Sequence, residues 1–153
     1  MTKDDLKKLC DLRGELEAKE RELADQEERG YQLYEKRKIW RESVLMSSTD
    51  AACRIVESRV DSADIAPKEI AVKVRVQQLK AELADTQERY DLLEAEVIAW
   101  LLTLDDWRIR DILKKRYLLG QSVKEVAGVL NYSENSIINW ESRFWGGNGK
   151  KSI

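Results

Sequence analysis

One apolar heptad pattern constrains the fold of this chain more than any other feature of its sequence. After Pro67, ten residues follow one another at alternating steps of mostly three and four positions, and nine of these ten residues are apolar. They are Val72, Val76, Leu79, Leu83, Thr86, Tyr90, Leu93, Val97, Trp100 and Leu104. This repeat places one stripe along an α-helix and predicts a left-handed coiled coil with another helix. Pro67 fits the first helical position, because its missing N–H needs no partner there.

The N-terminal third offers a partner helix for this stripe. Leu9, Leu16 and Leu23 lie seven residues apart, and Leu6, Leu12, Leu33 and Tyr34 widen their stripe. We expect helices at about 3–46 and 67–103, joined by a connection at 47–66 that is bounded by Ser, Thr and Asp clusters. An antiparallel hairpin is the default arrangement, and a parallel homodimer through the second helix fits the pattern equally well. The expected seam comprises Leu9, Leu16, Leu23, Val76, Leu79, Leu83, Tyr90, Leu93 and Val97.

The composition argues against several classes of function. The chain has no His and two Cys, Cys10 and Cys53, so imidazole catalysis is excluded and a zinc site lacks ligands. A glycine-rich phosphate loop is also absent, so we expect no enzyme, cofactor, metal or small-molecule substrate. No apolar run approaches about 18 residues, and the N-terminus lacks a signal peptide's apolar stretch. We therefore expect a cytoplasmic protein without a membrane segment.

Residues 103–145 show shorter helices with clear start and stop signals. The run from Thr103 to Asp106 predicts a helix start, and Gly120 predicts its end in the left-handed conformation. Ser122 with Glu125 forms a capping box for a second helix. A left-handed Asn131 and a capping Ser133 then lead into a third helix at 134–145, and 146–153 is expected to be a flexible tail. The predicted fold is all-α: a long coiled-coil region over 1–102 and a small three-helix domain over 103–145.

The helices 122–130 and 134–145 have the dimensions of a helix-turn-helix, because only a tight link joins them. The small Ala127 lets the second helix cross closely. Residues 103–153 carry nine Lys or Arg against six Asp or Glu, whereas the rest of the chain carries 18 against 23. This modest basic excess favours an anionic partner at the C-terminal end. The predicted core of the motif comprises Ile112, Tyr117, Val126, Ala127, Leu130, Ile137 and Trp140.

The run from Leu102 to Trp145 resembles the C-terminal promoter-reading domain of bacterial sigma factors. It is more similar still to phage late-transcription regulators of the RinA/ArpU type. The shared features are an "RY..G" phrase at residues 116–120 and an "s..E(I/V)A..L..s...(I/V)" phrase at residues 122–137. The sequence departs from the pattern in two respects: Asn131 replaces a usual Gly, and residues 134–136 contain no Arg. The resemblance implies a helix-turn-helix fold and a phage-encoded transcription regulator, for example an activator, in the bacterial host cytoplasm.

If this module binds double-stranded DNA, the helix 134–145 enters the major groove. Its base-reading candidates are Glu134, Asn135, Ile138 and Asn139, and its phosphate-binding candidates are Lys114, Lys115, Lys124, Ser133 and Arg143. Arg116 is either a further phosphate candidate or forms an internal pair with Glu125 or Asp111. We expect a homo-oligomer, with a dimer favoured, formed through the coiled coil. The alternatives are a ring-forming subunit like phage small terminases, or a protein-interaction module that contacts RNA polymerase.

Overall fold

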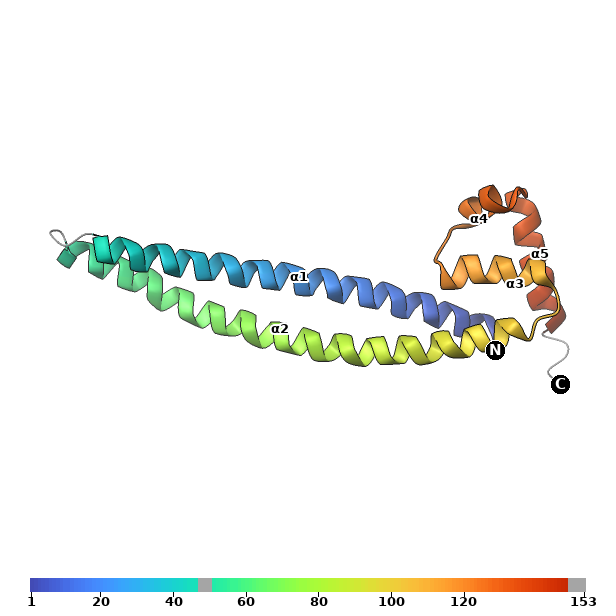
Figure 1. Ribbon diagram of the computed structural model, residues 1–153, viewed down its shortest axis with the longest axis horizontal. Helices are drawn as coiled ribbons and strands as arrows, with labels where there is room; N and C mark the ends of the chain where they lie inside the picture. Colours follow the sequence, from blue (N-terminus) through green and yellow to red (C-terminus); the bar gives the residue numbers. More distant parts are fainter. Residues whose placement is uncertain (47–50, 149–153) are drawn as a thin grey trace. The chain divides into compact units, whose positions relative to one another are not determined.

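The computed structural model describes residues 1–46 and 51–148, and the side chains of residues 1–39 and 65–146. Throughout these residues the regular structure is helical, which confirms the predicted all-α class. The helices, shown in Figure 1, are α1 (Lys3–Met46), α2 (Ala51–Leu102), α3 (Trp107–Leu113), the π-helix η1 (Lys114–Leu118), α4 (Val123–Leu130) and α5 (Glu134–Asn148).

Helices α1 and α2 form an antiparallel hairpin (Figure 1). The α2 stripe therefore packs against α1 of the same chain, which confirms the expected antiparallel hairpin. Within residues 16–85, Arg75 donates to Glu22 from Nε at 2.9 Å and from Nη2 at 2.7 Å. Arg37 lies 3.4 Å from Glu69, whose side chain is almost fully buried. These pairs run along the edges of the apolar seam and help to fix its register.

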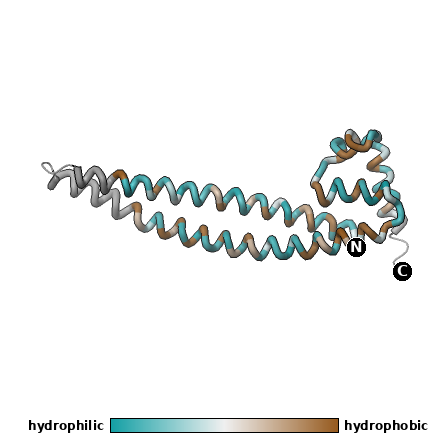
Figure 2. Tube along the Cα trace, viewed as in Figure 1, coloured by the Kyte–Doolittle hydropathy of each residue, from teal (hydrophilic) through white to brown (hydrophobic). Residues whose placement is uncertain are grey.

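The expected seam residues are all buried or half-buried, and Figure 2 shows hydrophobic residues recurring along both helices of the hairpin. Because the seam is only two helices wide, many of its side chains keep one edge in solvent. Tyr34 does not widen the seam: 48% of it is exposed, and the Arg37 guanidinium lies 5.6 Å from its ring centroid. The buried seam members are Leu9, Leu16, Leu79 and Val97, and the half-buried ones are Leu23, Val76, Leu83, Tyr90 and Leu93.

Helix α2 begins earlier than the sequence pattern suggested. It starts at Ala51, so Pro67 lies inside the helix, and most of the expected connection at 47–66 is helical. A proline inside a helix removes one backbone hydrogen bond and costs about 3 kcal/mol in an isolated helix. In a helix of 52 residues, the favourable contributions of many other positions offset that local cost. Residues 47–50 lie outside the described part of the chain.

The predicted stop and start signals of the C-terminal helices are confirmed. Gly120 has φ of 68° and Asn131 has φ of 57°, both in the left-handed region. The Ser122 amide donates to Glu125 at 2.7 Å, and the Glu125 amide donates to the Ser122 hydroxyl at 3.2 Å, which completes the capping box. The Ser133 hydroxyl accepts from the Ser136 amide at 3.1 Å. These features depend on neighbouring residues, so the local sequence specifies them.

Two boundaries differ from the prediction. The cap of α3 is Asp106, whose carboxylate accepts from the Arg108 amide at 2.9 Å, whereas the Thr103 hydroxyl donates back to the Trp100 carbonyl at 2.6 Å. Thr103 therefore closes the end of α2 instead of opening α3. Helix α5 continues to Asn148, so residues 146–148 are helical and not part of a tail. Residues 149–153 lie outside the described part.

The described chain forms two compact units, residues 1–15 with 86–153 and residues 16–85. The sequence pattern predicted a domain boundary between residues 102 and 103. The unit that holds α3, η1, α4 and α5 also contains the first residues of α1 and the last residues of α2. The reason is a shared core of Leu6, Leu9, Val97, Leu101, Ile109, Leu113 and Tyr117. In the described chain no helix is both long and apolar enough to cross a membrane.

Candidate functional site

The candidate site is built on the pair of helices α4 and α5. Buried side chains from α3, α4 and α5 meet between them, and Ala127 is only 6% exposed where the two helices pack. The Tyr132 and Trp140 rings contact edge to face, with centroids 4.8 Å apart. Tyr117 lies instead in the core shared with the hairpin. The remaining predicted core residues lie together here: Ile112, Val126, Ala127 and Ile137 are buried, and Leu130 and Trp140 pack against them.

The first two turns of α5 present one exposed face. Glu134, Asn135 and Asn139 are exposed, and Ile138 is exposed over 50% of its surface. The opposite side of the same helix is buried through Ile137. The four base-reading candidates therefore share one accessible helix face, which carries carboxylate, carboxamide and methyl groups.

The phosphate-binding candidates occupy different environments. Among the described side chains Lys114, Lys124 and Arg143 are exposed. Lys115 is half-buried and lies 3.8 Å from Asp111 one turn away. The hydroxyl of Ser133 is engaged in capping α5. Lys114, Lys124 and Arg143 are consequently the candidates that are most accessible to an external anion.

A buried polar cluster fixes α5 to the preceding helix. Glu141 is 4% exposed, accepts a hydrogen bond from the Tyr117 hydroxyl at 2.6 Å, and forms an ion pair with Arg116. Burial, and then the neighbouring Glu141 carboxylate, raise the pKa of Tyr117 well above its usual value. Arg116 is thus internal, but its partner is Glu141 rather than Glu125 or Asp111. Sequence reasoning missed Glu141, although its position one turn after Ile137 placed it on the inward side of the helix.

A second residue that sequence reasoning missed, Arg13 of α1, closes the end of η1. Its Nη2 donates to the Tyr90 hydroxyl at 3.1 Å, to the Tyr117 carbonyl at 3.2 Å and to the Leu118 carbonyl. The last carbonyls of a helix have no intrahelical partner, so these bonds act as a C-terminal cap from a distant segment. In the sequence nothing sets Arg13 apart from the other charged residues of the expected helix at 3–46.

Cys10 lies beside this capping interaction. Its Sγ is 3.9 Å from the Tyr117 carbonyl, and burial raises the pKa of the thiol. Cys53 falls outside the described side chains. Within the described residues no three or more acidic or cysteine side chains gather into a possible metal site. Cys10 packs against the core that contains Tyr117.

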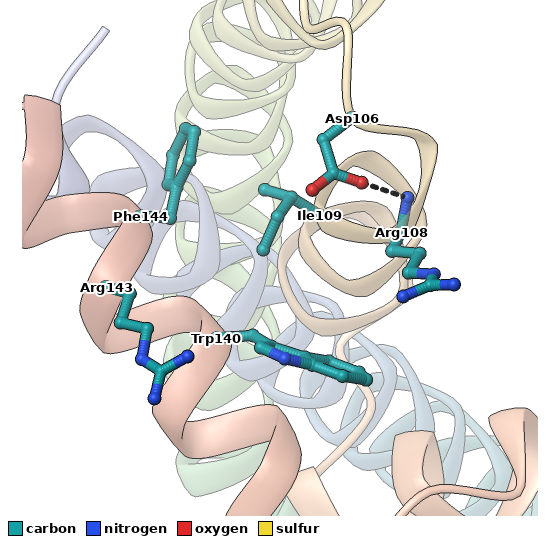
Figure 3. Close-up of a pocket in the computed structure, with 6 residues that line it drawn as sticks. All are labelled: Asp106, Arg108, Ile109, Trp140, Arg143 and Phe144. Carbon is teal, nitrogen blue, oxygen red and sulfur yellow. Dashed lines mark hydrogen bonds between the residues drawn. The ribbon is translucent and has the colours of Figure 1, made fainter.

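A cavity of about 330 Å³ opens between the start of α3 and the second half of α5. Figure 3 shows its apolar wall of Ile109, Trp140 and Phe144, with Asp106 at one side. Arg108 and Arg143 add two cationic side chains to the lining. Its lining combines an apolar surface with positive charge, and Arg143 belongs both to this cavity and to the predicted phosphate contacts.

The comparisons with known proteins assign no family to the chain. No family model matches it, and no solved structure matches it. One curated protein, described as an "Enzymatic polyprotein" of soybean chlorotic mottle virus, is 37% identical over 65 residues. The match covers 39% of this chain, and the chain spans only 9% of the polyprotein.

Proposed function

We propose that this protein is a sequence-specific DNA-binding transcription regulator that reads the major groove with α5. The observation that carries the proposal is the division of α5 into two sides. Glu134, Asn135, Ile138 and Asn139 form an exposed polar and methyl-bearing face, whereas Ile137 is buried on the other side. A helix held firmly on one side and exposed on the other is what a recognition helix requires.

The exposed groups suit the edges of base pairs. A carboxamide such as that of Asn135 or Asn139 pairs with N6 and N7 of adenine, and a carboxylate such as Glu134 accepts from N4 of cytosine. The Ile138 side chain suits a thymine methyl group. Lys114, Lys124 and Arg143 would contact phosphates, which position the protein without reading sequence. Lys115 is a further phosphate candidate if it leaves Asp111.

The modest basic excess of the C-terminal region predicts modest affinity for a single module. Two modules on one oligomer would bind two half-sites, and the linked binding would raise the overall affinity. We therefore propose that the helical hairpin also oligomerises the protein, most simply as a dimer. The proposal assigns the protein no catalytic activity, cofactor or small-molecule substrate. The resemblance to phage late regulators supports a phage origin and action in the host cytoplasm.

The experiment that tests α5 is a selection of bound sequences from a random pool of double-stranded DNA. The wild-type chain should enrich one motif, and Asn139→Ala should lose preference at one base position with about a 10-fold to 100-fold weaker affinity for the wild-type motif. Gln32→Ala removes an exposed amide from α1 and should leave the motif unchanged. Identical motifs from the wild type and Asn139→Ala would contradict the assignment of Asn139.

A second candidate is a protein-interaction module that binds RNA polymerase. It is favoured by the exposed apolar Ile138 beside the acidic Glu134, since neither side chain suits phosphates. Pull-down of purified RNA polymerase together with no enrichment of any DNA motif would support this candidate over direct DNA binding. A ring-forming role is the third alternative, and a measured mass of eight or more chains would favour it.

A further inference from the structure

Helix α2 carries a second heptad stripe on the side opposite its seam with α1. Four large apolar residues mark the two ends of this outer stripe. Ile70 and Val74 are 64% and 49% exposed, and Ile98 and Leu102 are 44% and 70% exposed. On one 52-residue helix, these positions belong to a single series with alternating steps of four and three. A repeat of this kind is typical of a coiled-coil seam.

The middle of the outer stripe consists mainly of small residues. Ala81, Ala84 and Ala95 are exposed, and their short side chains let another helix approach closely. The remaining positions of the series are polar: Gln77, Glu88 and Asp91. Seven of the ten stripe positions are therefore apolar, although α1 covers none of the four large ones. A solvated face has no need of apolar residues in heptad register.

We propose that this outer stripe binds the same stripe of a second copy of the chain, with the two α2 helices antiparallel. The direction follows from the pattern of residues. A parallel in-register pair would place Glu88 opposite Glu88 and Asp91 opposite Asp91, and like charges in a seam are destabilising. An antiparallel pair places Glu88 opposite Ala84 and Asp91 opposite Ala81, so no acidic residue of the stripe faces its own copy.

The antiparallel register also pairs the apolar ends. Ile70 then faces Leu102 of the second copy, Val74 faces Ile98, and the two-fold axis repeats both contacts at the other end. Such a self-complementary interface is the isologous type that closes a dimer. The self-complementary series of apolar residues therefore selects a second copy as the occupant.

The outer stripe is the surface through which the chain would oligomerise in the proposed function. This dimer can be tested without DNA. Sedimentation equilibrium of the wild-type chain at micromolar concentration should give twice the chain mass of 17.8 kDa. The double variant Val74→Glu with Ile98→Glu should weaken dimerisation about 100-fold or more, because it places four charges in the seam. Both side chains are exposed in the chain itself, so its helix content by circular dichroism should not change.

A matched control is Tyr31→Glu on α1, where a side chain that is 63% exposed receives the same charge. This variant should remain a dimer. A wild-type monomer at these concentrations, or a double variant that dimerises as tightly as the wild type, would overturn the proposed interface. Base-specific DNA binding measured for the monomeric variant would still support the role of α5, so the two proposals fail separately.

Cysteine cross-linking tests the direction of the pair. In a background with Cys10→Ser and Cys53→Ser, we prepare Val74→Cys and Ile98→Cys as two single variants. A mixture of the two should form a disulfide-linked dimer under mild oxidation, whereas each variant alone should not. Efficient cross-linking of either variant alone would show a parallel pair, and no cross-link in any sample would remove the α2 interface.

Discussion

Glu141 is the single side chain on which the position of α5 depends most. Its carboxylate is almost fully buried and satisfies both Arg116 and the Tyr117 hydroxyl. Glu141→Ala should lower the free energy of unfolding by about 2–4 kcal/mol, because Arg116 would stay largely buried without its partner. Urea unfolding followed by circular dichroism measures this loss. Glu134→Ala removes an exposed carboxylate from the same helix, and an equal loss in that control would contradict the account.

Tyr117→Phe tests the other contact of the same carboxylate. Removal of the hydroxyl deletes one hydrogen bond to a charged acceptor, so we expect a smaller loss of about 1.5–3 kcal/mol. The double variant Tyr117→Phe with Glu141→Ala should lose less than the sum of the two single losses, because both changes break the same interaction. A strictly additive result in urea unfolding would show that the two residues act independently.

The Cys10 thiol gives a prediction about pH. Burial raises its pKa, so at any pH near 8 a smaller fraction is thiolate than in an unfolded chain. In a Cys53→Ser background, alkylation by iodoacetamide should be slower in the folded protein, and its rate should rise at higher pH than in urea. Equal pH profiles in the folded and unfolded states would argue against a buried thiol.

Single residues also show where sequence reasoning succeeds. The capping box at Ser122 and the left-handed Gly120 and Asn131 were predictable, because each depends on backbone groups within a few residues. Arg13 and Glu141 were not, because their partners lie 104 and 25 residues away. A charged residue on an apolar side of a helix indicates only that a partner must exist, and the tertiary fold decides which one.

At the level of elements, the junction between α1 and η1 is the most informative. Arg13→Ala should destabilise the unit of residues 1–15 and 86–153 by roughly 1–3 kcal/mol, because the Tyr117 and Leu118 carbonyls lose their donors. Hydrogen exchange of the η1 amides should report the change directly. Arg21→Ala serves as the control, since Arg21 is exposed and pairs with Glu17 on its own helix. Equal protection of η1 in both variants would contradict the capping role of Arg13.

Gly120→Ala tests the same junction from its other side. A Cβ at this position would lie 2.6 Å from Arg13 Nη1, and φ of 68° is costly for any residue with a Cβ. We expect a loss of about 1–2 kcal/mol, read by thermal unfolding. Gly128→Ala in α4 is the matched control, because a Cβ there meets nothing within 4 Å. That substitution should be neutral or slightly stabilising.

The elements also show the limit of local signals. Pro67 and the Ser and Asp clusters predicted a connection through residue 66, yet α2 starts at Ala51. Proline is the strongest local helix breaker, but a long helix that packs along α1 gains enough elsewhere to tolerate it. The heptad stripe, by contrast, correctly predicted a long helix that packs along another helix, since its signal extends over more than four heptads, but it fitted a parallel pairing equally well.

At the level of the whole molecule, the hairpin and the C-terminal helices share a core, so they are not independent. Leu9 is fully buried in the cluster that contains Ile109 and Leu113 of α3. The sequence could not reveal this shared core, because a stripe of leucines does not indicate which residues pack against its end. The exposed α5 face, which sequence reasoning selected, is therefore carried by a unit that includes the N-terminus of the chain.

The central claim is that the chain binds DNA through α5. Gel retardation of duplex fragments from the genome that encodes the chain, at 50 mM and 200 mM salt, tests it most directly. The account predicts a retarded complex with specific fragments at 50 mM salt, weaker binding at 200 mM, and loss of fragment preference in Asn135→Ala with Asn139→Ala. Failure of the wild-type chain to retard any fragment at 50 mM salt would contradict it.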